Sequence, residues 1–347
     1  MCGIAGIVGN SPIENIKGMV VAMSHRGPDD SGIHWMAGMA LGMARLAVLD
    51  VTSAGHQPMT NHNGLIWMIY NGETYNFHSE RTILEGKGHQ FKSHSDTEVV
   101  LHMYEEYGDD FLLRMRGMFA LAIYDQRKGQ GQERLLLARD QLGIKPLLYC
   151  QTAKHFLFAS EIKALLASGL VERQVDTEAL RLLLTFGSVN QPYSMINGVK
   201  MLLPGHRLIL EKGAARIEKY WRLDVGRRAE LSRLPYKDLV SLVRESLEES
   251  VRLQMVSDVQ LGAFLSGGVD SSLLVALMAR NSSSRIKTFS VGVEAEGSSM
   301  DESGDAERTA QFIGTDHARV VVTGREVFDR INHIAAALDQ PSVDGVN

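Results

Sequence analysis

From Val259 to Leu338 the sequence alternates between short apolar runs and longer amphipathic stretches, separated by short polar loops. Strands and helices in strict alternation are typical of a parallel sheet, because each parallel strand needs a crossover connection before the next one. The pattern therefore predicts a parallel α/β domain of the nucleotide-binding type. Its strands are predicted at 259–265, 287–293 and 319–322, and its helices at 271–280, 302–313 and 326–338.

The first two-thirds of the chain has a different pattern, in which short apolar runs such as 65–70 end at Gly, Asn or Asp. Such runs are typical of buried strands bounded by turns. Helices are predicted at 96–107 and 177–184. After Trp221 a segment rich in Arg and Lys leads into a predicted helix at 236–255. These changes predict two domains, 1–221 and 236–347, joined by a linker at 222–235.

Charge and composition exclude several classes of protein. The 347 residues contain 36 Lys and Arg against 41 Asp and Glu, a net charge of −5 that is too mild for a nucleic-acid partner. The apolar runs are far shorter than the roughly 20 residues that cross a bilayer, and the N-terminus lacks the features of a secretion signal. We therefore expect no membrane partner and a cytoplasmic location. The oligomeric state stays open, a homodimer included.

The cysteines and histidines predict neither a disulfide framework nor a zinc site. There are only two cysteines, Cys2 and Cys150, and the second follows an apolar run, as a buried structural residue would. Among the twelve histidines, His25, His56 and His62 fall in separate predicted loops, and no pair has a metal-ligand spacing.

A cysteine directly after the initiator methionine is a candidate nucleophile. Removal of Met1 would place a thiol and a free α-amine on one residue, and pKa values of ~8.5 and ~7.7–8.0 let them exchange a proton near neutral pH. Attack on an amide also needs donors for the oxyanion, which the Asn71 amide and the Gly72 N–H can supply. Taken singly, a cysteine such as Cys2 is more often a buried strand residue, and an Asn-Gly pair is common in hairpin turns.

A series of motifs in this part of the chain resembles, in order, those of class II glutamine amidotransferases. The resemblance covers nearly all of 1–221 and is greatest to the glutaminase domain of B-type asparagine synthetases. It implies an N-terminal nucleophile hydrolase with an αββα sandwich, which cleaves glutamine to glutamate and ammonia. The motifs are MCGIAGIVG, HRGPDDSG, MARLAVLD, GHQPM, YNGETYN, SDTEVV, GMFALAIYD, ARDQLGIKPLLY and FASEIKALL.

The resemblance also implies roles for individual residues. A guanidinium suits a carboxylate because it can form two parallel hydrogen bonds with it. If they lay outside these motifs, Arg45, Glu73 and Asp96 would each be interpreted as a solvated surface charge. The implied roles are nucleophile for Cys2, oxyanion hole for Asn71 and Gly72, binding of the glutamine α-carboxylate for Arg45, and binding of its α-ammonium for Glu73 and Asp96.

The heptapeptide SGGVDSS at 266–272 lies between a predicted strand and a predicted helix. Paired glycines let backbone N–H groups approach an anion, and a helix N-terminus adds partial positive charge, so the segment suits a phosphate. It has neither the Walker A ending nor the dinucleotide fingerprint. A glycine-rich turn with a serine helix cap is the alternative without a function. The motif resembles the PP-motif of ATP pyrophosphatase domains, which follows the glutaminase domain in asparagine synthetases.

This second resemblance implies ATP and Mg²⁺ as cofactors and aspartate as the acceptor. The acceptor would be activated as aspartyl-adenylate, and ammonia channelled from glutamine would convert it to asparagine, AMP and pyrophosphate. Another carboxylate, such as a sugar acid, is the alternative acceptor, and a non-catalytic regulatory protein is the alternative class. The implied roles are phosphate binding for Ser266, Gly267, Gly268, Ser271 and Ser272, Mg²⁺ binding for Asp270, and contact with adenine for Leu265 and Val291.

Members of the family carry a second ATP and Mg²⁺ motif, with catalytic lysines, well beyond the PP-motif. Here the tail at 338–347 resembles the segment just before that motif. Open α/β sheets also usually have more than three strands. We therefore expect this chain to be the N-terminal part of a longer protein.

Overall fold

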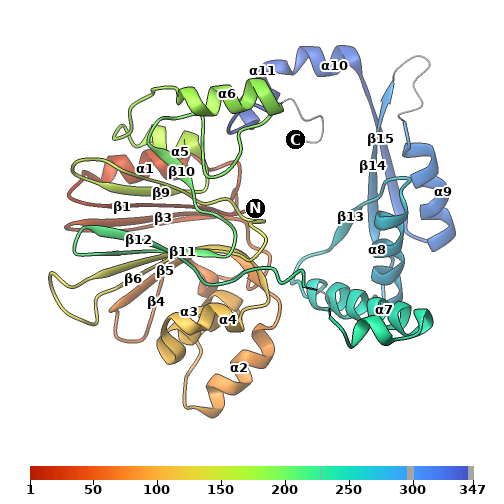
Figure 1. The fold of residues 1–347 in the computed structure, drawn as a ribbon, viewed down its shortest axis with the longest axis horizontal. Coiled ribbons are helices and arrows are strands. Elements are labelled where there is room, and N and C mark those ends of the chain that lie inside the picture. The colour runs from red at the N-terminus through yellow and green to blue at the C-terminus, as the bar shows by residue number, and fades with distance from the viewer. Residues whose placement is uncertain (227, 295–300, 343–347) are drawn as a thin grey trace. The chain divides into compact units, whose positions relative to one another are not determined.

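The computed structural model describes residues 1–226, 228–294 and 301–342, and its helices and strands are labelled in Figure 1. These residues form two compact units. The first unit comprises Met1–Asp224 together with 338–342, and the second comprises Val225–Ala337. Of the predicted family-like tail, residues 343–347 lie outside the described ranges. No helix within those ranges is long and apolar enough to cross a membrane.

The first unit contains two antiparallel sheets of six strands that stack face to face (Figure 1). The first sheet has the order β10 (Val199–Met201), β8 (Leu148–Gln151), β9 (Phe156–Ala159), β1 (Gly3–Val8), β3 (Met39–Arg45) and β2 (Asp30–Met36). The second has the order β12 (Ala214–Lys219), β11 (His206–Glu211), β7 (Arg134–Arg139), β6 (Gly117–Asp125), β5 (Ile66–Thr74) and β4 (Met59–Thr60).

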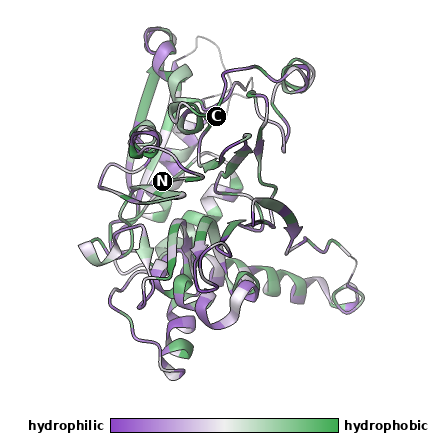
Figure 2. Cartoon of the chain, turned by 90° about the vertical axis from the view of Figure 1, so that its left-hand side faces the viewer, coloured by the Kyte–Doolittle hydropathy of each residue, from purple (hydrophilic) through white to green (hydrophobic). Residues whose placement is uncertain are grey.

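Helices cover the outer faces of both sheets, which confirms the αββα sandwich implied by the resemblance. In Figure 2 most helices carry both hydrophobic and hydrophilic residues, as expected where one side packs on a core. The helices on the first sheet are α1 (Ile13–Ala22) and α5 (Ile162–Ala167). Those on the second sheet are α3 (Asp96–Tyr107) and α4 (Phe111–Arg114), and α2 (Phe77–Gly86) packs on α3. The last helix of this unit along the chain is α6 (Thr177–Phe186). Short 3₁₀ turns lie at Ser53–Gly55, Gly108–Asp110 and Leu231–Arg233.

The strand β6 shows how the sandwich is packed. Its residues Leu121 and Ile123 enter the core beneath α3, whereas Ala120 and Ala122 enter the core between the two sheets. Successive side chains of a strand point to opposite faces, so a strand buried on both faces must be apolar throughout. This explains why the motif GMFALAIYD lacks polar alternation.

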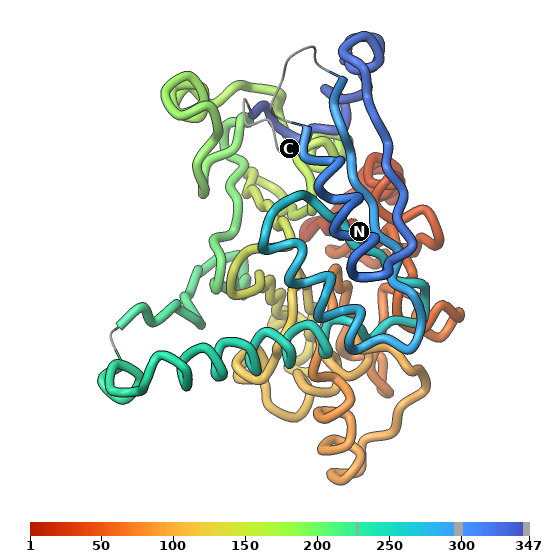
Figure 3. The backbone as a smooth tube through the Cα atoms, turned by 90° about the vertical axis from the view of Figure 1, so that its right-hand side faces the viewer, coloured from red at the N-terminus to blue at the C-terminus, as the bar shows by residue number. Residues whose placement is uncertain are grey.

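The second unit contains the predicted parallel sheet, with the strand order β13 (Gly262–Phe264), β14 (Lys287–Glu294) and β15 (Asp316–Thr323). Figure 3 traces this unit from its long first helix to the strands. Its helices are α7 (Tyr236–Gln254), α8 (Val269–Arg280), α9 (Ser303–Ile313), α10 (Gly324–Asp329) and α11 (Ile331–Ala337).

Only one face of this parallel sheet is covered. Thr288 and Ser290 of β14 are buried, and a small core of Leu265 with residues of α8 and α9 lies there. On β14, Val291 and Val293 alternate with these buried residues and are more than half exposed. The other face of the sheet is therefore apolar and exposed within the described residues.

Several bounds predicted from the sequence differ from the structure; β15, for example, begins at Asp316 instead of residue 319, and α6 ends at Phe186 instead of residue 184. The strand predicted at 259–265 is limited to β13. The Ser257 hydroxyl accepts a hydrogen bond from the Val259 N–H at 3.2 Å and donates one to the Val259 carbonyl at 3.0 Å, so residues 257–259 form a local turn. The helix predicted at 326–338 divides at Arg330, whose ψ of 6° leaves the helical range. The strand predicted at 65–70 continues as β5 to Thr74.

Candidate functional site

Cys2 lies directly before β1, where its side chain contacts the core between the two sheets. Its Sγ accepts a hydrogen bond from the Leu46 N–H at 3.3 Å and donates one to the Leu46 carbonyl at 3.5 Å. Burial raises the pKa of the Cys2 thiol, and the Leu46 N–H opposes this shift. The positive charges of Arg45 and Lys145 also lower this pKa. Burial outweighs these opposing contacts, so the pKa of Cys2 is raised and the folded surroundings favour the protonated thiol.

A buried ion pair holds the backbone of Cys2 in place. The Arg26 guanidinium donates from Nε to the Cys2 carbonyl at 2.9 Å and from Nη1 to Glu161 Oε1 at 2.9 Å. Ser160, next to Glu161, accepts from the Ile4 N–H at 3.0 Å. We assigned no role to these residues from the sequence, although they lie in the motifs HRGPDDSG and FASEIKALL.

Asn71 and Gly72 lie inside β5, opposite Ala120 and Phe119 of β6. The hairpin-turn interpretation of this pair is therefore wrong. A Cβ on Gly72 would lie 2.5 Å from the Met118 carbonyl oxygen, so this close approach of two strands requires glycine. The Asn71 side chain is buried, and its Nδ2 has no hydrogen-bond partner among the described residues. Leaving such a donor unpaired costs about 1–3 kcal/mol, so the site suits a ligand that brings an acceptor.

Arg45 ends β3 as a buried guanidinium held by a loop. Its Nη2 donates to the Leu49 carbonyl at 3.1 Å and to the Asp50 carbonyl at 2.6 Å. Gly55 packs directly on the guanidinium, since a Cβ there would lie 2.2 Å from Nη2. Asp50 has a φ of 51°, which is uncommon for a residue other than glycine, and its carboxylate accepts from the His94 N–H at 2.8 Å. The loop thus sets the orientation of the guanidinium.

Glu73 and Asp96 form a pair of carboxylates in a largely buried place. Asp96 begins α3, and its Oδ2 accepts from the N–H of Thr74, the neighbour of Glu73, at 2.8 Å. Burial raises the pKa of Glu73, and the charge of Asp96 raises it further. Burial also raises the pKa of Asp96, against hydrogen bonds from Thr74 and Thr97. Two such carboxylates repel each other unless a cation lies near them, so the pair suits an ammonium group.

Lys145 is a residue of this site that we did not identify from the sequence. Its side chain is buried, burial lowers its pKa, and the charges of Glu73 and Cys2 raise it. The Asp140 carboxylate positions its backbone, because Oδ2 accepts from the Lys145 N–H at 3.0 Å and the Phe119 N–H at 3.2 Å. The only available signal was its place in the motif ARDQLGIKPLLY. The charges of Arg45 and Lys145 thus act on Cys2, and Lys145 also acts on Glu73, which in turn interacts with Asp96.

A hollow lies at the carboxyl end of β13 and beside the middle of β14, at the motif SGGVDSS. Leu265, Ser266, Ser271 and Val291 all line it. The hydroxyls of Ser266 and Ser271 lie 2.8 Å apart. Four other candidates are not among the residues that line the hollow, namely Gly267, Gly268, Asp270 and Ser272. Gly268 caps α8, and its carbonyl accepts a hydrogen bond from Ser272 Oγ at 2.7 Å. Asp270 is exposed in the first turn of α8.

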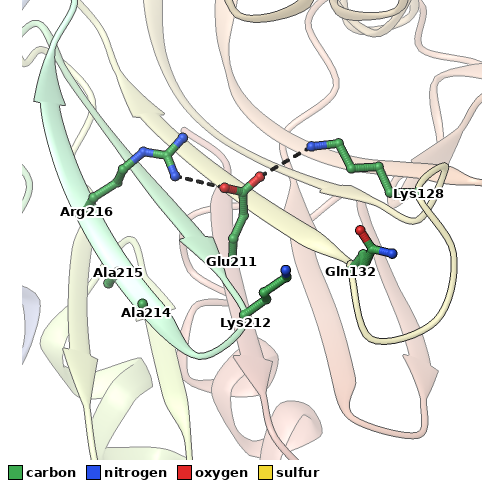
Figure 4. A pocket seen from close by; sticks show the side chains of 7 residues that line it. All are labelled: Lys128, Gln132, Glu211, Lys212, Ala214, Ala215 and Arg216. Atoms are coloured by element: carbon green, nitrogen blue, oxygen red, sulfur yellow. Dashed lines mark hydrogen bonds and ion pairs between the residues drawn. The ribbon is translucent and has the colours of Figure 1, made fainter.

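Another hollow lies between the β11–β12 hairpin and the 128–132 loop, and Glu211 is the one carboxylate among its lining residues. Figure 4 shows Glu211 between two cations of this hollow, with Arg216 Nη1 at 2.8 Å and Lys128 Nζ at 3.8 Å. Lys212 adds a third positive charge, so the lining has a net positive charge, and none of its residues belongs to the group around Cys2 or to SGGVDSS. We do not treat this hollow as a candidate site.

Comparison with known proteins places both units in families. Residues 1–221 match the family model described as a glutamine amidotransferase domain, and residues 242–347 match the model described as asparagine synthase. Asparagine synthetase [glutamine-hydrolyzing] 3 of Bacillus subtilis is 33% identical over 100% of this chain and 58% of its own length. Putative asparagine synthetase [glutamine-hydrolyzing] 2 of Methanocaldococcus jannaschii is 32% identical over 99% of this chain and 69% of its own. Amidase chry2 of Gibberella zeae is 31% identical over 91% of this chain and 50% of its own.

The sandwich of two sheets and the match over residues 1–221 define a class II glutamine amidotransferase domain. The chain belongs to the family of glutamine-hydrolysing asparagine synthetases, with part of an asparagine synthase domain after the amidotransferase domain. It spans 58% of the length of the Bacillus relative.

Proposed function

We propose that the first unit hydrolyses glutamine at Cys2 and that the ammonia serves an ATP-dependent synthesis of asparagine in the whole protein. The observation that carries the first step is the buried Asn71 amide, whose Nδ2 has no partner among the described residues. A donor kept buried and unpaired beside a closely packed glycine N–H is the arrangement that an oxyanion needs.

In this proposal the cysteine activates itself once Met1 has been removed. Met1 is 60% exposed, so the terminal residue is accessible for cleavage. The Cys2 thiol passes its proton to its own α-amine, and the thiolate attacks the amide carbon of glutamine. The Asn71 amide and the Gly72 N–H hold the resulting oxyanion. Collapse of this intermediate breaks the C–N bond, the proton returns to the leaving nitrogen as ammonia departs, and water then hydrolyses the thioester to glutamate.

The charged residues would orient glutamine over Cys2. Arg45 binds the α-carboxylate with the part of its guanidinium that the loop carbonyls leave free, and Glu73 with Asp96 binds the α-ammonium. Lys145, whose charge acts on both Glu73 and Cys2, keeps a positive potential beside the thiolate. Opposite charges at the two ends of the amino-acid group fix which end of glutamine reaches the nucleophile.

For the second unit we propose an ATP site at SGGVDSS. The residues fit the ligand: the first turn of α8 presents backbone N–H groups to phosphates, and Leu265 and Val291 offer apolar contacts to a base in the same hollow. Gly267 packs tightly there, since a Cβ would lie 2.9 Å from Asp305 Cβ. The exposed carboxylate of Asp270 offers an oxygen ligand to Mg²⁺. ATP would supply the leaving group that activates a carboxylate.

Aspartate is the acceptor that we propose, because the relatives that match nearly the whole chain are named asparagine synthetases. A different carboxylate, such as a sugar acid, is the second candidate. The match to a protein named as an amidase over 91% of this chain shows that the relatives of this chain do not all carry the name asparagine synthetase. Product analysis with ATP, Mg²⁺, glutamine and each acceptor in the full-length protein distinguishes the two.

The glutaminase step is tested by glutamate release from L-glutamine. Cys2→Ala is expected to abolish it, whereas Cys150→Ala, a matched change at the buried second cysteine, is expected to preserve it. Asn71→Ala is expected to lower kcat by ~10²–10³-fold with little change in KM. Intact-mass measurement is expected to show loss of Met1. Near-normal turnover by Cys2→Ala would overturn the proposal, and an Asn71→Ala effect confined to KM would remove Asn71 from the oxyanion hole.

A further inference from the structure

Three metal-ligating side chains converge beside α3, away from Cys2. We call them the histidine cluster: His89, His102 and Glu105. His102 and Glu105 lie on successive turns of α3, and His89 lies in the segment between α2 and α3. The two Nδ1 atoms of the histidines are 3.2 Å apart, and Glu105 Oε2 lies 2.8 Å from His102 Nδ1. One ligand atom from each residue lies within 4.8 Å of the other two.

Acidic groups occupy the far side of both imidazole rings. His89 Nε2 lies 3.2 Å from Glu106 Oε2, and His102 Nε2 lies 3.9 Å from Glu98 Oε1. At His89 the carboxylate beside Nε2 favours the tautomer that carries its proton there, so the lone pair of Nδ1 can face the shared centre. At His102 the Glu105 carboxylate lies nearer to Nδ1 than the Glu98 carboxylate does to Nε2, so a metal ion would replace the proton at Nδ1 while Glu98 accepts from Nε2. Metal-ligating histidines in proteins are commonly oriented in this way by a carboxylate.

The third ligand is oriented in the same manner. The second carboxylate oxygen of Glu105 accepts from Asn61 Nδ2 at 2.6 Å, which leaves Oε2 directed at the histidines. All three side chains are largely shielded from solvent, with exposed fractions of 18% for His89, 9% for His102 and 21% for Glu105. Three electron-rich atoms in such a place repel one another unless a cation lies between them.

The spacing of the ligand atoms fits a small divalent ion. Bonds of ~2.0–2.1 Å in a tetrahedral site place neighbouring ligand atoms about 3.3 Å apart. The observed separations of 3.2 and 2.8 Å are close to this value. Two imidazoles with one carboxylate are a ligand set that suits zinc, and they leave a fourth position for water.

We propose that His89 Nδ1, His102 Nδ1 and Glu105 Oε2 bind a divalent transition-metal ion of the zinc class. The ion would tie the segment before α3 to the body of the helix whose first residue is Asp96. Its role is structural, because none of its ligands belongs to the group around Cys2. The proposal does not depend on glutamine hydrolysis. The competing occupant of the cluster is a proton shared among the same atoms.

The test measures zinc bound to the full chain carrying Cys2→Ala, so that this thiol cannot contribute a ligand. After exposure to ZnCl₂ and dialysis, we expect one zinc per chain by elemental analysis. Co²⁺ in place of zinc should give the visible absorption of a tetrahedral ion, and ZnCl₂ should raise the midpoint of thermal unfolding. Absence of stoichiometric zinc would overturn the proposal in favour of the shared proton.

Single substitutions locate the ion. His89→Ala and the isosteric Glu105→Gln are each expected to weaken zinc binding at least tenfold, the loss usual even for an outer-shell partner. His78→Ala, at an exposed histidine of α2, is the matched control and should bind as the parent does. Equal zinc binding in all three variants would overturn the assignment. Because His89 lies outside the helices and Glu105→Gln keeps the side-chain volume, the test does not depend on a variant that disrupts α3.

Discussion

The two units bury their sheets in different ways. In the first unit, strands such as β6 have an apolar core on each face, whereas the parallel sheet of the second unit has one covered face and one exposed apolar face. The candidate sites differ accordingly. Around Cys2 the charges are buried and their pKa values shift, whereas the SGGVDSS hollow is formed by a glycine-rich loop and the start of a helix.

This difference shows what each kind of site requires. A site made of buried charges needs a rigid surround, because every unpaired charge in it costs free energy. A site made of backbone N–H groups at a helix start needs only the correct loop geometry. Removal of one buried group should therefore have a larger effect in the first unit than a comparable change in the second.

The largest contrast is expected between two phenylalanines. Phe158 of β9 is fully buried between the sheets, and Phe312 of α9 is 93% exposed. Phe158→Ala should lower the free energy of unfolding by about 3–5 kcal/mol, and Phe312→Ala by less than about 0.5 kcal/mol. Urea unfolding of both variants is followed by far-ultraviolet circular dichroism, which detects the helices of both units, and tryptophan fluorescence reports the first unit, because all three tryptophans lie before residue 222. Equal effects of the two substitutions would remove the contrast in packing.

A smaller effect, on catalysis, is expected at Arg45. Arg45→Lys keeps the charge but loses the fork that contacts both the loop carbonyls and a carboxylate. We expect kcat/KM for glutamine to fall by about 100-fold, which is the loss expected when hydrogen bonds to a charged group are removed. The fall should be nearly as large as in Arg45→Ala. Steady-state glutamate release measures kcat/KM in both variants. A lysine variant with the parent kcat/KM would show that rigid geometry at this charge is unnecessary.

Glu73→Gln is expected to lower kcat/KM for glutamine and to raise the free energy of unfolding. It removes a partner of the α-ammonium, so kcat/KM should fall by roughly 10–100-fold. It also removes a carboxylate that is costly to ionise in the folded state. Urea unfolding near pH 8 should therefore show a gain of about 1 kcal/mol, and Glu172→Gln, at an exposed glutamate, should show none.

The pH dependence of stability tests the same residue. Because the pKa of Glu73 is raised by folding, the folded state binds more protons than the unfolded state above the ordinary glutamate value of ~4.3. Its contribution to stability therefore falls as the pH rises through the raised pKa, and this fall should be weaker in Glu73→Gln. The KM for glutamine should decrease over the same rise, since the ammonium needs ionised carboxylates. A parent protein whose stability rises with pH in this window would contradict the assignment.

The smallest effect is expected on the exposed sheet face. The double substitution Val293→Thr with Val320→Thr keeps two β-branched residues and makes the open face of β14 and β15 more polar. Light scattering at matched concentration should show less self-association, with a change in unfolding free energy below about 0.5 kcal/mol. Val99→Thr, in the core beneath α3, should instead cost about 1–3 kcal/mol. Unchanged scattering would show that the exposed face does not drive association.

Much of the fold followed from local pattern. The alternation after Val259 predicted the parallel sheet correctly, and the helix predicted at 96–107 has the bounds of α3. Errors arose where a side-chain hydrogen bond or a strand pairing, neither of which the hydrophobic pattern encodes, decided the outcome. The Ser257 turn shortens β13, and pairing with β6 carries β5 through an Asn-Gly sequence that is common in turns.

The sequence by itself determined which residues could do chemistry: a cysteine beside the initiator, ordered amidotransferase motifs and a phosphate-binding heptapeptide. Only the tertiary structure decided which charges act on one another. Lys145 acts on Cys2 and Glu73 because strands far apart in the sequence stack, and His89 meets His102 because α2 packs on α3. Burial is also a property of the packed molecule, so the unpaired Asn71 amide and the raised pKa of Glu73 have no counterpart in the linear sequence.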